Sequence, residues 1–431
     1  MSVRRIGPSL ARSGRILIVG AGPAGWSAAG ELRQLGFAGE VTVVCDEPGA
    51  PYDRTACSKG LLDGHQRPDD VRLDLRACPG VDWRVARAEW LDPDDRAVGL
   101  STGEAHRYDG LVIATGARAE LPADWPVGEP GLHVLHAVEQ AWALRKDLRH
   151  ARRVAIVGGG LTGCEVASTV RALARDVVLV NSQPYLMHRV LGAPVAELVT
   201  REHAQAGIEL RLGRRVRSAD RGRGRWRLRL DDGQDVHADV VVMSAGERPD
   251  TAWLEGSGLD IEDGVRCDAA LRAVGGDGAP VPGVVAAGVV ARWPNLRYRA
   301  EPHRVGHWIA AIEQGQAAAR TLLLGDAAEP ATLVPRFWSA QLAMRIQVCG
   351  RIEPDAAVEI SELRPARRDT ARAGVVANCY ANGDLAGVVA VNAPHAFAPA
   401  AQSLLAGFGA PPLAAAAAGG ATAPRRMWAV R

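Results

Sequence analysis

The 431-residue sequence predicts an α/β protein with two similar parallel-sheet domains and a C-terminal α+β domain. Residues 15–32 and 153–173 share one pattern, in which an apolar strand runs into GxGxxG and then into a helix rich in small residues. Each unit is followed by a later apolar strand that ends in glycine, at 111–116 and 240–246. A pair of such units is far more specific than one glycine motif, so both are interpreted as Rossmann-like dinucleotide-binding units.

The first unit, RILIVGAGPAGWSAAGEL, has the three glycines of a phosphate-binding turn. The first glycine makes the tight turn, the second lets the backbone approach a pyrophosphate, and the third lets the helix pack on the strand. Free N–H groups and the dipole at the start of the helix favour a diphosphate. The next strand, VTVVCDE, ends in two acids, as a dinucleotide site requires. The candidate binding residues are Gly20, Gly22, Pro23, Ala24, Gly25, Asp46 and Glu47.

The second unit, RVAIVGGGLTGCEVASTVRAL, repeats this turn, and the strand after it closes on Asn181. Between the two units, YDGLVIATGA predicts a buried strand followed by small residues that allow close approach beside a dinucleotide. We therefore expect that the chain binds two dinucleotides or descends from one that did. The candidate residues of these segments are Ala114, Thr115, Gly116, Gly158, Gly160, Gly163 and Asn181.

Composition argues against several classes of function. The chain is 47% hydrophobic and 23% charged with a net charge of +2, so no broad basic field indicates nucleic acid, and no apolar run could span a bilayer. Residues 1–14 lack the apolar core of a signal peptide and are expected to be a flexible extension, and residues 409–431 a flexible tail. Seven scattered cysteines form no CxxC, which favours a reducing cytoplasm and argues against a metal site.

Lysine is nearly missing from the chain. Of 51 lysines and arginines only Lys59 and Lys146 are lysines. A lysine supplies a compact ammonium with a movable proton, which arginine does not. Because Lys59 lies in PYDRTACSKGLL, a loop that follows the first unit, it is a candidate functional residue, with a chance surface lysine as the alternative.

Taken together, these motifs resemble the FAD-dependent NAD(P)H:ferredoxin or rubredoxin reductases, the putidaredoxin-reductase-like branch of the two-dinucleotide flavoproteins, whose fold is glutathione-reductase-like. The resemblance covers about residues 15–405 and includes PYLMHRVLG, VPGVVAAGVVARWPN, HRVGHW, VPRFWSAQ and GVVAVNAP. It implies an FAD domain over 15–118 and 245–327, an inserted NAD(P)H domain over 119–244 and a C-terminal domain over 328–408.

The resemblance also implies an activity. Hydride would pass from NADH or NADPH to the flavin, and single electrons then to a ferredoxin-type iron–sulfur protein, in a cytoplasmic monomer or homodimer. Lys59 would reach the flavin and pair with Glu165, and Trp338 would lie near the flavin. The further cofactor-binding residues carried over by the resemblance are Arg54, Gly288, Val289 and Trp308.

Several positions depart from the family pattern. The family usually has a flavin-binding aspartate where this chain has Val289, and a glutamate for the NADH ribose where it has Asn181, so Val289→Asp is expected to tighten FAD binding. Gly306 replaces glutamate and Ala340 replaces aspartate. Cys57, in place of leucine, is either an apolar filler, which we favour, or a thiol activated by a nearby lysine.

These departures leave alternatives open. A divergent member could use flavin without nicotinamide, as a tailoring enzyme acting on a small-molecule substrate in a specialised pathway. It could also have lost both cofactors and serve as a structural partner of another protein. Asn181 can still form a hydrogen bond with a ribose hydroxyl, and the loss of the acid removes the repulsion toward a 2′-phosphate. The replacement therefore does not by itself decide whether the chain binds NADH, NADPH or neither.

Overall fold

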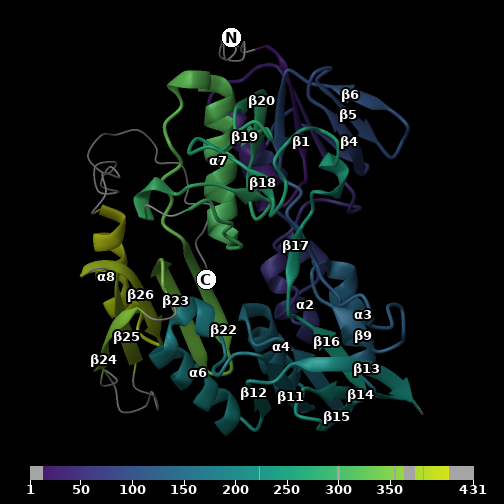
Figure 1. Ribbon diagram of the computed structural model, residues 1–431, viewed down its shortest axis with the longest axis vertical. Helices are drawn as coiled ribbons and strands as arrows, with labels where there is room; N and C mark the ends of the chain where they lie inside the picture. Colours follow the sequence, from purple (N-terminus) through teal and green to yellow (C-terminus); the bar gives the residue numbers. More distant parts are fainter. Residues whose placement is uncertain are drawn as a thin grey trace.

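The computed structural model describes residues 13–406 except 223, 299–300, 354–355, 364–373 and 382. The expected tail at 409–431 and nearly all of the expected extension at 1–14 lie outside these residues. Two parallel sheets and one antiparallel sheet organise the described chain, in agreement with the predicted fold class (Figure 1).

The first sheet has the strand order β19-β20-β7-β1-β2-β3. Its centre is parallel because β1 (Arg15–Val19) pairs with β2 (Glu40–Cys45) on one side and with β7 (Gly110–Ile113) on the other. A segment far along the chain, β20 (Pro280–Ala286), pairs in parallel with β7 and so completes the same sheet. The outer strands are β3 (Asp82–Val85) and β19 (Arg272–Val274). A separate antiparallel sheet consists of β4 (Ala88–Asp92), β5 (Ala97–Leu100) and β6 (Ala105–Arg107).

Two helices pack closely together on this sheet. Helix α1 (Pro23–Gln34) lies along α7 (Trp308–Leu324), and a Cβ atom at Gly315 of α7 would come within 2.1 Å of the Ala24 carbonyl oxygen. Because both helices begin at the carboxyl ends of the parallel strands, their positive ends point to the same edge of the sheet, where ligands bind in open α/β folds.

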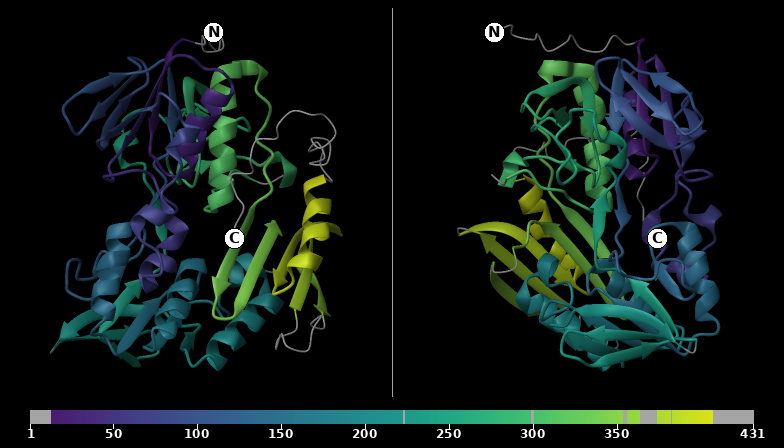
Figure 2. Two further views of the ribbon diagram at one scale, coloured as in Figure 1. Left: turned by 180° about the vertical axis from the view of Figure 1, so that it is seen from behind. Right: turned by 45° about the vertical axis from the view of Figure 1, so that its right-hand side comes forward.

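The second sheet has the order β12-β11-β10-β16-β9 and is parallel throughout. Figure 2 shows it at the end of the molecule opposite to β1. A three-stranded antiparallel sheet packs on one of its faces through a shared apolar cluster. The strands of the parallel sheet are β9 (Leu132–Val134), β10 (Arg153–Val157), β11 (Asp176–Asn181), β12 (Glu209–Leu212) and β16 (Val240–Met243). The helices of this part of the chain are α3 (Val138–Leu148), α4 (Leu161–Ala172), α5 (His188–Leu191) and α6 (Ala193–Gln205). The three-stranded antiparallel sheet consists of β13 (Val216–Gly222), β14 (Arg225–Leu230) and β15 (Asp235–Ala238).

The third sheet is antiparallel, with the order β22-β23-β26-β25-β24. One of its faces shares an apolar cluster with the second domain, in which Ile346 and Val389 are buried together with Leu191 and Val195. The other face is covered by α8 (Pro394–Ala406). The strands are β22 (Arg336–Gln341), β23 (Met344–Gly350), β24 (Ala357–Leu363), β25 (Gly374–Ala381) and β26 (Asp384–Val391).

A two-stranded link joins the first two sheets. Strand β8 (Ala117–Ala119) leads from the first sheet to the second, and β17 (Glu247–Pro249) leads back beside it in antiparallel pairing (Figure 1). The remaining short elements are α2 (Gly60–Asp63), β18 (Val265–Arg266) and β21 (Ala291–Arg292). The link matters for the site because it brings side chains from both crossings to the edge where α1 and α7 begin.

Candidate cofactor site

A cavity of about 740 Å³ lies where the three sheets meet. Its walls come from the carboxyl ends of β1, β2 and β7, the loop before α2, the first turns of α4 and α7, the link strands β8 and β17, and strand β22. Carboxyl ends of parallel strands are where ligands bind in this class of fold. A cavity of this size accommodates a large cofactor.

The first glycine turn has the geometry of a phosphate cradle. A Cβ atom at Gly20, where φ is +109°, would lie 2.1 Å from the Ala114 carbonyl oxygen, and one at Gly25 would lie 1.9 Å from the Gly20 carbonyl oxygen. Only glycine fits these two positions. Gly22 differs, because a Cβ there would meet no atom of the described chain within 4 Å. The backbone is thus open at Gly22, at the start of α1, where a diphosphate can approach its N–H groups.

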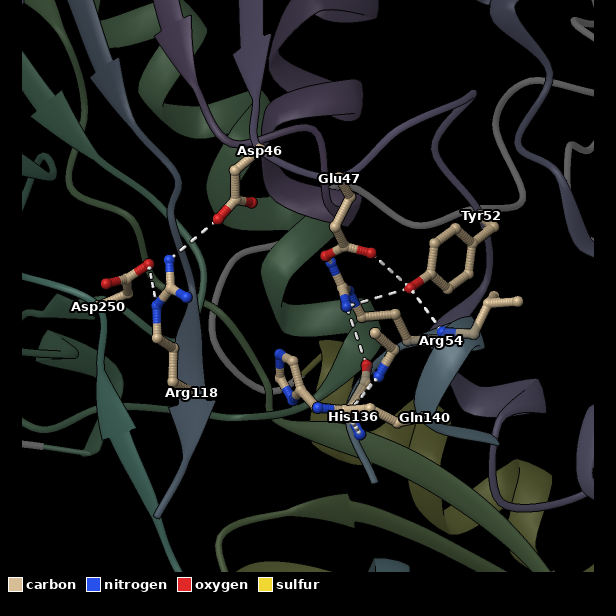
Figure 3. A network of polar contacts seen from close by, with 10 residues as sticks. Asp46, Glu47, Tyr52, Arg54, Arg118, His136, Gln140 and Asp250 are labelled. Carbon is tan, nitrogen blue, oxygen red and sulfur yellow. Dashed lines mark hydrogen bonds and ion pairs between the residues drawn. The ribbon is translucent and has the colours of Figure 1, made fainter. Parts of the chain in front are cut away.

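The acid pair at the end of β2 is held by two arginines (Figure 3). Glu47 forms an ion pair with Arg54 and accepts a hydrogen bond of 2.6 Å from the Tyr52 hydroxyl. Arg54 also donates to the His136 carbonyl oxygen at 2.9 Å, which joins the first domain to the segment before α3. Burial raises the pKa of Tyr52, as does its hydrogen bond to Glu47, so this hydroxyl stays a donor at neutral pH.

Asp46 has a different partner that the sequence did not reveal. Arg118 of β8 lies 3.0 Å from Asp46 and 2.9 Å from Asp250, and all three line the cavity (Figure 3). The only sequence signal for Arg118 is its place two residues after Gly116, at the end of a strand already assigned to the site.

Lys59 and Glu165 form the predicted pair. Lys59 Nζ lies 2.7 Å from Glu165 Oε2, and the Glu165 side chain is only 6% exposed. The same carboxylate accepts hydrogen bonds from Ser58 and, at 2.7 Å, from the Ser339 hydroxyl of β22. Glu165 therefore ties together the loop before α2, helix α4 and the third sheet, and it fixes the lysine at the cavity wall. Contact of Lys59 with a flavin stays a prediction.

The segment after β20, which contains Gly288 and Val289, lies against the first glycine turn. Gly288, where φ is +84°, donates from its N–H to Gln314 Oε1 at 2.7 Å, and a Cβ there would be 3.1 Å from the Ala24 Cβ. Val289 faces the cavity near Gly116 and Gly306. The position at which the family usually has an acid therefore faces the cavity here with a hydrocarbon side chain.

Aromatic side chains close the end of the cavity near Lys59. Trp338 of β22 is 40% exposed and lines the cavity, while the neighbouring Phe337 stacks on His307 with ring centroids 4.6 Å apart. Trp308, the first residue of α7, also lines this wall. Burial lowers the pKa of His307 to about 4, so its imidazole is neutral at physiological pH.

The second glycine turn repeats the geometry of the first. A Cβ at Gly158, where φ is +115°, would lie 2.4 Å from the Ser244 carbonyl oxygen, and one at Gly163 would lie 1.9 Å from the Gly158 carbonyl oxygen. Gly160 is exposed, and a Cβ there would meet nothing in the described chain within 4 Å. The first turn of α4 that follows contributes Leu161 and Thr162 to the cavity. The second cradle is thus sterically as complete as the first, which argues against an unused remnant.

The Asn181 amide holds the loop that follows β11. Asn181 is 7% exposed, and its Nδ2 donates to the carbonyl oxygens of Gln183 and Tyr185 at 3.1 and 2.9 Å. Its Oδ1 accepts from the Gly159 N–H at 3.3 Å. Both N–H donors of the amide are therefore used within the protein, and they hold the 181–185 loop against the glycine turn. Because Oδ1 has a second lone pair, the expected hydrogen bond with a ribose hydroxyl stays a prediction.

Cys57 has the surroundings of a filler. It is 3% exposed and packs in an apolar cluster with Leu61, Val71, Val138 and Ala141. Burial raises the pKa of its thiol to about 12. The thiol is therefore protonated at neutral pH, which favours the apolar interpretation over an activated thiolate.

The described residues contain neither a metal-binding cluster nor a membrane-spanning helix. No group of three or more histidine, cysteine, aspartate or glutamate side chains there could hold a metal ion. None of its helices is long and apolar enough to cross a membrane.

Comparison with known proteins extends these observations. The family model for pyridine nucleotide-disulphide oxidoreductases matches residues 14–315. The chain is 31% identical over 397 residues to the probable ferredoxin reductase CtmF of Castellaniella defragrans, covering 91% of this chain and 93% of that protein. It is 34% identical over 343 residues to the ferredoxin–NAD(+) reductase component of the biphenyl dioxygenase system of Paraburkholderia xenovorans, covering 78% of this chain and 81% of that protein.

Solved structures give the same result. The chain is similar to the ferredoxin reductase for the CYP199A2 system from Rhodopseudomonas palustris, with a TM-score of 0.80 and 28% identity over 88% of this chain and 91% of that one. It is also similar to a chain of the covalent putidaredoxin reductase–putidaredoxin complex, with a TM-score of 0.80 and 25% identity over 91% of this chain and 93% of that one. The two-dinucleotide architecture predicted from the sequence is thereby confirmed.

Proposed function

The chain belongs to the pyridine nucleotide-disulphide oxidoreductase family, and we propose that it is an FAD-dependent NAD(P)H oxidoreductase that passes electrons to a ferredoxin-type iron–sulfur protein. One observation carries this proposal. The first glycine turn lines a single cavity, and helix α4, which begins at an equally intact second turn, reaches the same cavity through Leu161 and Thr162. The wall of this cavity also holds the Lys59–Glu165 pair and the exposed Trp338. A site for one dinucleotide alone would not need the second turn.

The residues present fit FAD in the first cradle. The open backbone at Gly22 and the start of α1 would hold the diphosphate. Asp46 and Glu47, which follow β2, would accept hydrogen bonds from the hydroxyl groups of the adenosine ribose. FAD, when bound, supplies an isoalloxazine ring that takes up a hydride and passes electrons on singly. Lys59, fixed by Glu165, would donate a hydrogen bond to that ring at the other end of the cavity.

The second cradle would hold the nicotinamide nucleotide. The diphosphate would lie on Gly160 at the start of α4, and the first turn of this helix lines the cavity. The stacked side chains of Phe337 and His307 would exclude water from this part of the cavity.

The iron–sulfur acceptor is supported by two features. Several relatives are named as the ferredoxin–NAD(+) reductase components of dioxygenase systems. In this chain, Trp338 is large, aromatic and exposed on an edge strand at the cavity mouth, which suits a small protein acceptor better than a buried substrate. This fits an acceptor that docks from outside while the two nucleotides stay enclosed.

The proposal is tested with the purified protein. We expect a flavin absorption spectrum that bleaches anaerobically with NADH or NADPH, followed by reduction of an added [2Fe–2S] ferredoxin. A flavin spectrum that neither nucleotide bleaches would contradict the nicotinamide step and favour a flavin enzyme of another kind. Protein that stays colourless after incubation with FAD and desalting would refute the whole proposal.

A further inference from the structure

The cavity contains a carboxylate without a partner. Six acidic side chains line it, and five of them form ion pairs with arginine or lysine: Asp46, Glu47, Glu89, Glu165 and Asp250. The sixth, Glu247 of β17, has no hydrogen bond or ion pair with any described residue. Glu247 is exposed to the cavity, so a ligand that fills the cavity would remove this carboxylate from water and would have to supply hydrogen-bond donors to it.

The position of this carboxylate is unusual. Glu247 Oε1 lies 3.3 Å from the point where a Cβ atom at Gly306 would be, and Val289 Cγ2 lies 3.6 Å from the same point. A Cβ atom at position 306 would make a tight contact with the Glu247 carboxylate, which would have to shift by a few tenths of an ångström, and an ordinary contact with Val289. The lack of a side chain at Gly306 gives the Glu247 carboxylate room beside Val289, on the cavity wall.

The surroundings disfavour an unpaired charge here. Although the side chain is open to the cavity, desolvation by neighbouring groups raises the pKa of Glu247, and Arg304 only partly opposes this. Arg304 is itself paired with Asp263 at 2.9 Å. A carboxylate in such a place is stabilised by hydrogen-bond donors of a ligand, and hydroxyl groups serve this purpose whereas a phosphate would repel it.

The location also selects which hydroxyl groups these are. Gly288 packs on Ala24 at the start of α1, so the Val289 position adjoins the turn that would hold the diphosphate. His307, the residue after Gly306, stacks on Phe337 next to Trp338, which marks the flavin end of the cavity. The adenosine end has its own acids at the end of β2. Glu247 therefore lies between the turn that would hold the diphosphate and the aromatic end of the cavity, where FAD bound in the first cradle would have its ribityl chain.

We infer that Glu247 is a binding residue for FAD and accepts hydrogen bonds from the hydroxyl groups of the ribityl chain. The inference rests on the flavin site of the proposed function and assigns it a residue from the interdomain link. It also accounts for a hydrocarbon at position 289, because the acceptor enters from β17 on the other side of Gly306. An aspartate at 289 would then place a second carboxylate beside the first.

The test compares binding of FAD and ADP to the apoprotein by calorimetry. Glu247→Val should weaken FAD binding by about 10- to 100-fold, the loss expected for a charge-assisted hydrogen bond, and leave ADP binding unchanged because ADP has no ribityl chain. Glu247→Gln keeps one acceptor and should lose less. Glu120→Val removes an exposed acid near Gly246, outside the cavity lining, and is the matched control for net charge.

A second pair of variants guards against a purely structural effect. Val289→Asp alone should weaken FAD binding, and the double variant Glu247→Val/Val289→Asp should bind FAD more tightly than Glu247→Val. Equal FAD affinity in wild type and Glu247→Val would overturn the inference, and so would an equal loss for FAD and ADP. Failure of the wild-type apoprotein to bind FAD would refute the proposed function instead, so the two failures are distinguishable.

Discussion

Replacing Gly22 by alanine should weaken FAD binding while leaving the fold intact. Gly22 has φ −64° and ψ −172°, an extended conformation open to any residue, and the added Cβ would meet no described atom within 4 Å. The new methyl group enters only the space that the diphosphate would use. Losing one charge-assisted hydrogen bond from a backbone N–H costs about 1.5–3 kcal/mol, so FAD should bind roughly 10- to 150-fold more weakly.

Two further glycines supply matched comparisons. Gly160→Ala, at the corresponding position of the second turn with φ −79° and ψ −169°, should weaken NAD(P)H binding and leave FAD content normal. Gly25→Ala should instead prevent folding, because its Cβ would lie 1.9 Å from the Gly20 carbonyl oxygen and α1 would have to move away from β1.

The assay combines three measurements on each variant. Circular dichroism reports the fold, the absorption spectrum after desalting reports FAD content, and calorimetry on the apoprotein gives the dissociation constants. Wild-type FAD affinity in Gly22→Ala would refute the assignment of the first turn. Loss of FAD from Gly160→Ala would refute the assignment of separate nucleotides to the two turns.

Three other predictions follow from the same geometry. Glu165→Gln leaves Lys59 without its counter-ion and should lower the free energy of unfolding, measured by urea denaturation, by about 2 kcal/mol. This is below the 3–5 kcal/mol of a fully buried pair because the lysine side chain is 29% exposed. Ser339→Ala, which removes one hydrogen bond to the same carboxylate, should cost about 1 kcal/mol. A Glu165→Gln loss no larger than that of Ser339→Ala would contradict the role of the pair. His307 has its pKa lowered to about 4, so between about pH 6.5 and 4 the unfolded chain binds a proton at this imidazole and the folded protein does not. The free energy of unfolding should therefore fall as the pH drops from 6.5 toward 4. Between pH 7.5 and 5 the wild type should lose about 2 kcal/mol more of this free energy than His307→Gln. Parallel losses in the two proteins would show that this imidazole does not titrate as described. Trp338→Ala should raise the KM for an iron–sulfur acceptor by roughly 30-fold, as for an aromatic hot spot of about 2 kcal/mol, with little change in ferricyanide reduction; an equal effect on both acceptors would argue against a docking role.

The sequence alone determined the two cradles and their order along the chain. Gly25 and Gly163 are required by contacts within one strand, turn and helix, so a pattern of a few residues records that steric need directly. Gly20 and Gly158 belong to the same pattern, although the carbonyl groups that exclude a Cβ there come from Ala114 and Ser244, at the end of another strand of each sheet. The Lys59–Glu165 pair was also reached from the sequence, through resemblance to a family and not through any local pattern.

Only the tertiary structure decided which polar groups face the cavity and which are used within the protein. Asp46, Arg118 and Asp250 meet across more than 200 residues of chain, and the interior use of the Asn181 amide depends on where its loop folds back. The sequence led to the expectation that Val289→Asp tightens FAD binding, whereas the carboxylate of Glu247 beside that position leads us to expect the opposite. The steric requirement at Gly25 and Gly163 arises between neighbours in the chain, so the sequence records it. The satisfaction of a charge depends on every group within a few ångströms, and those groups come from segments that only the folded chain brings together.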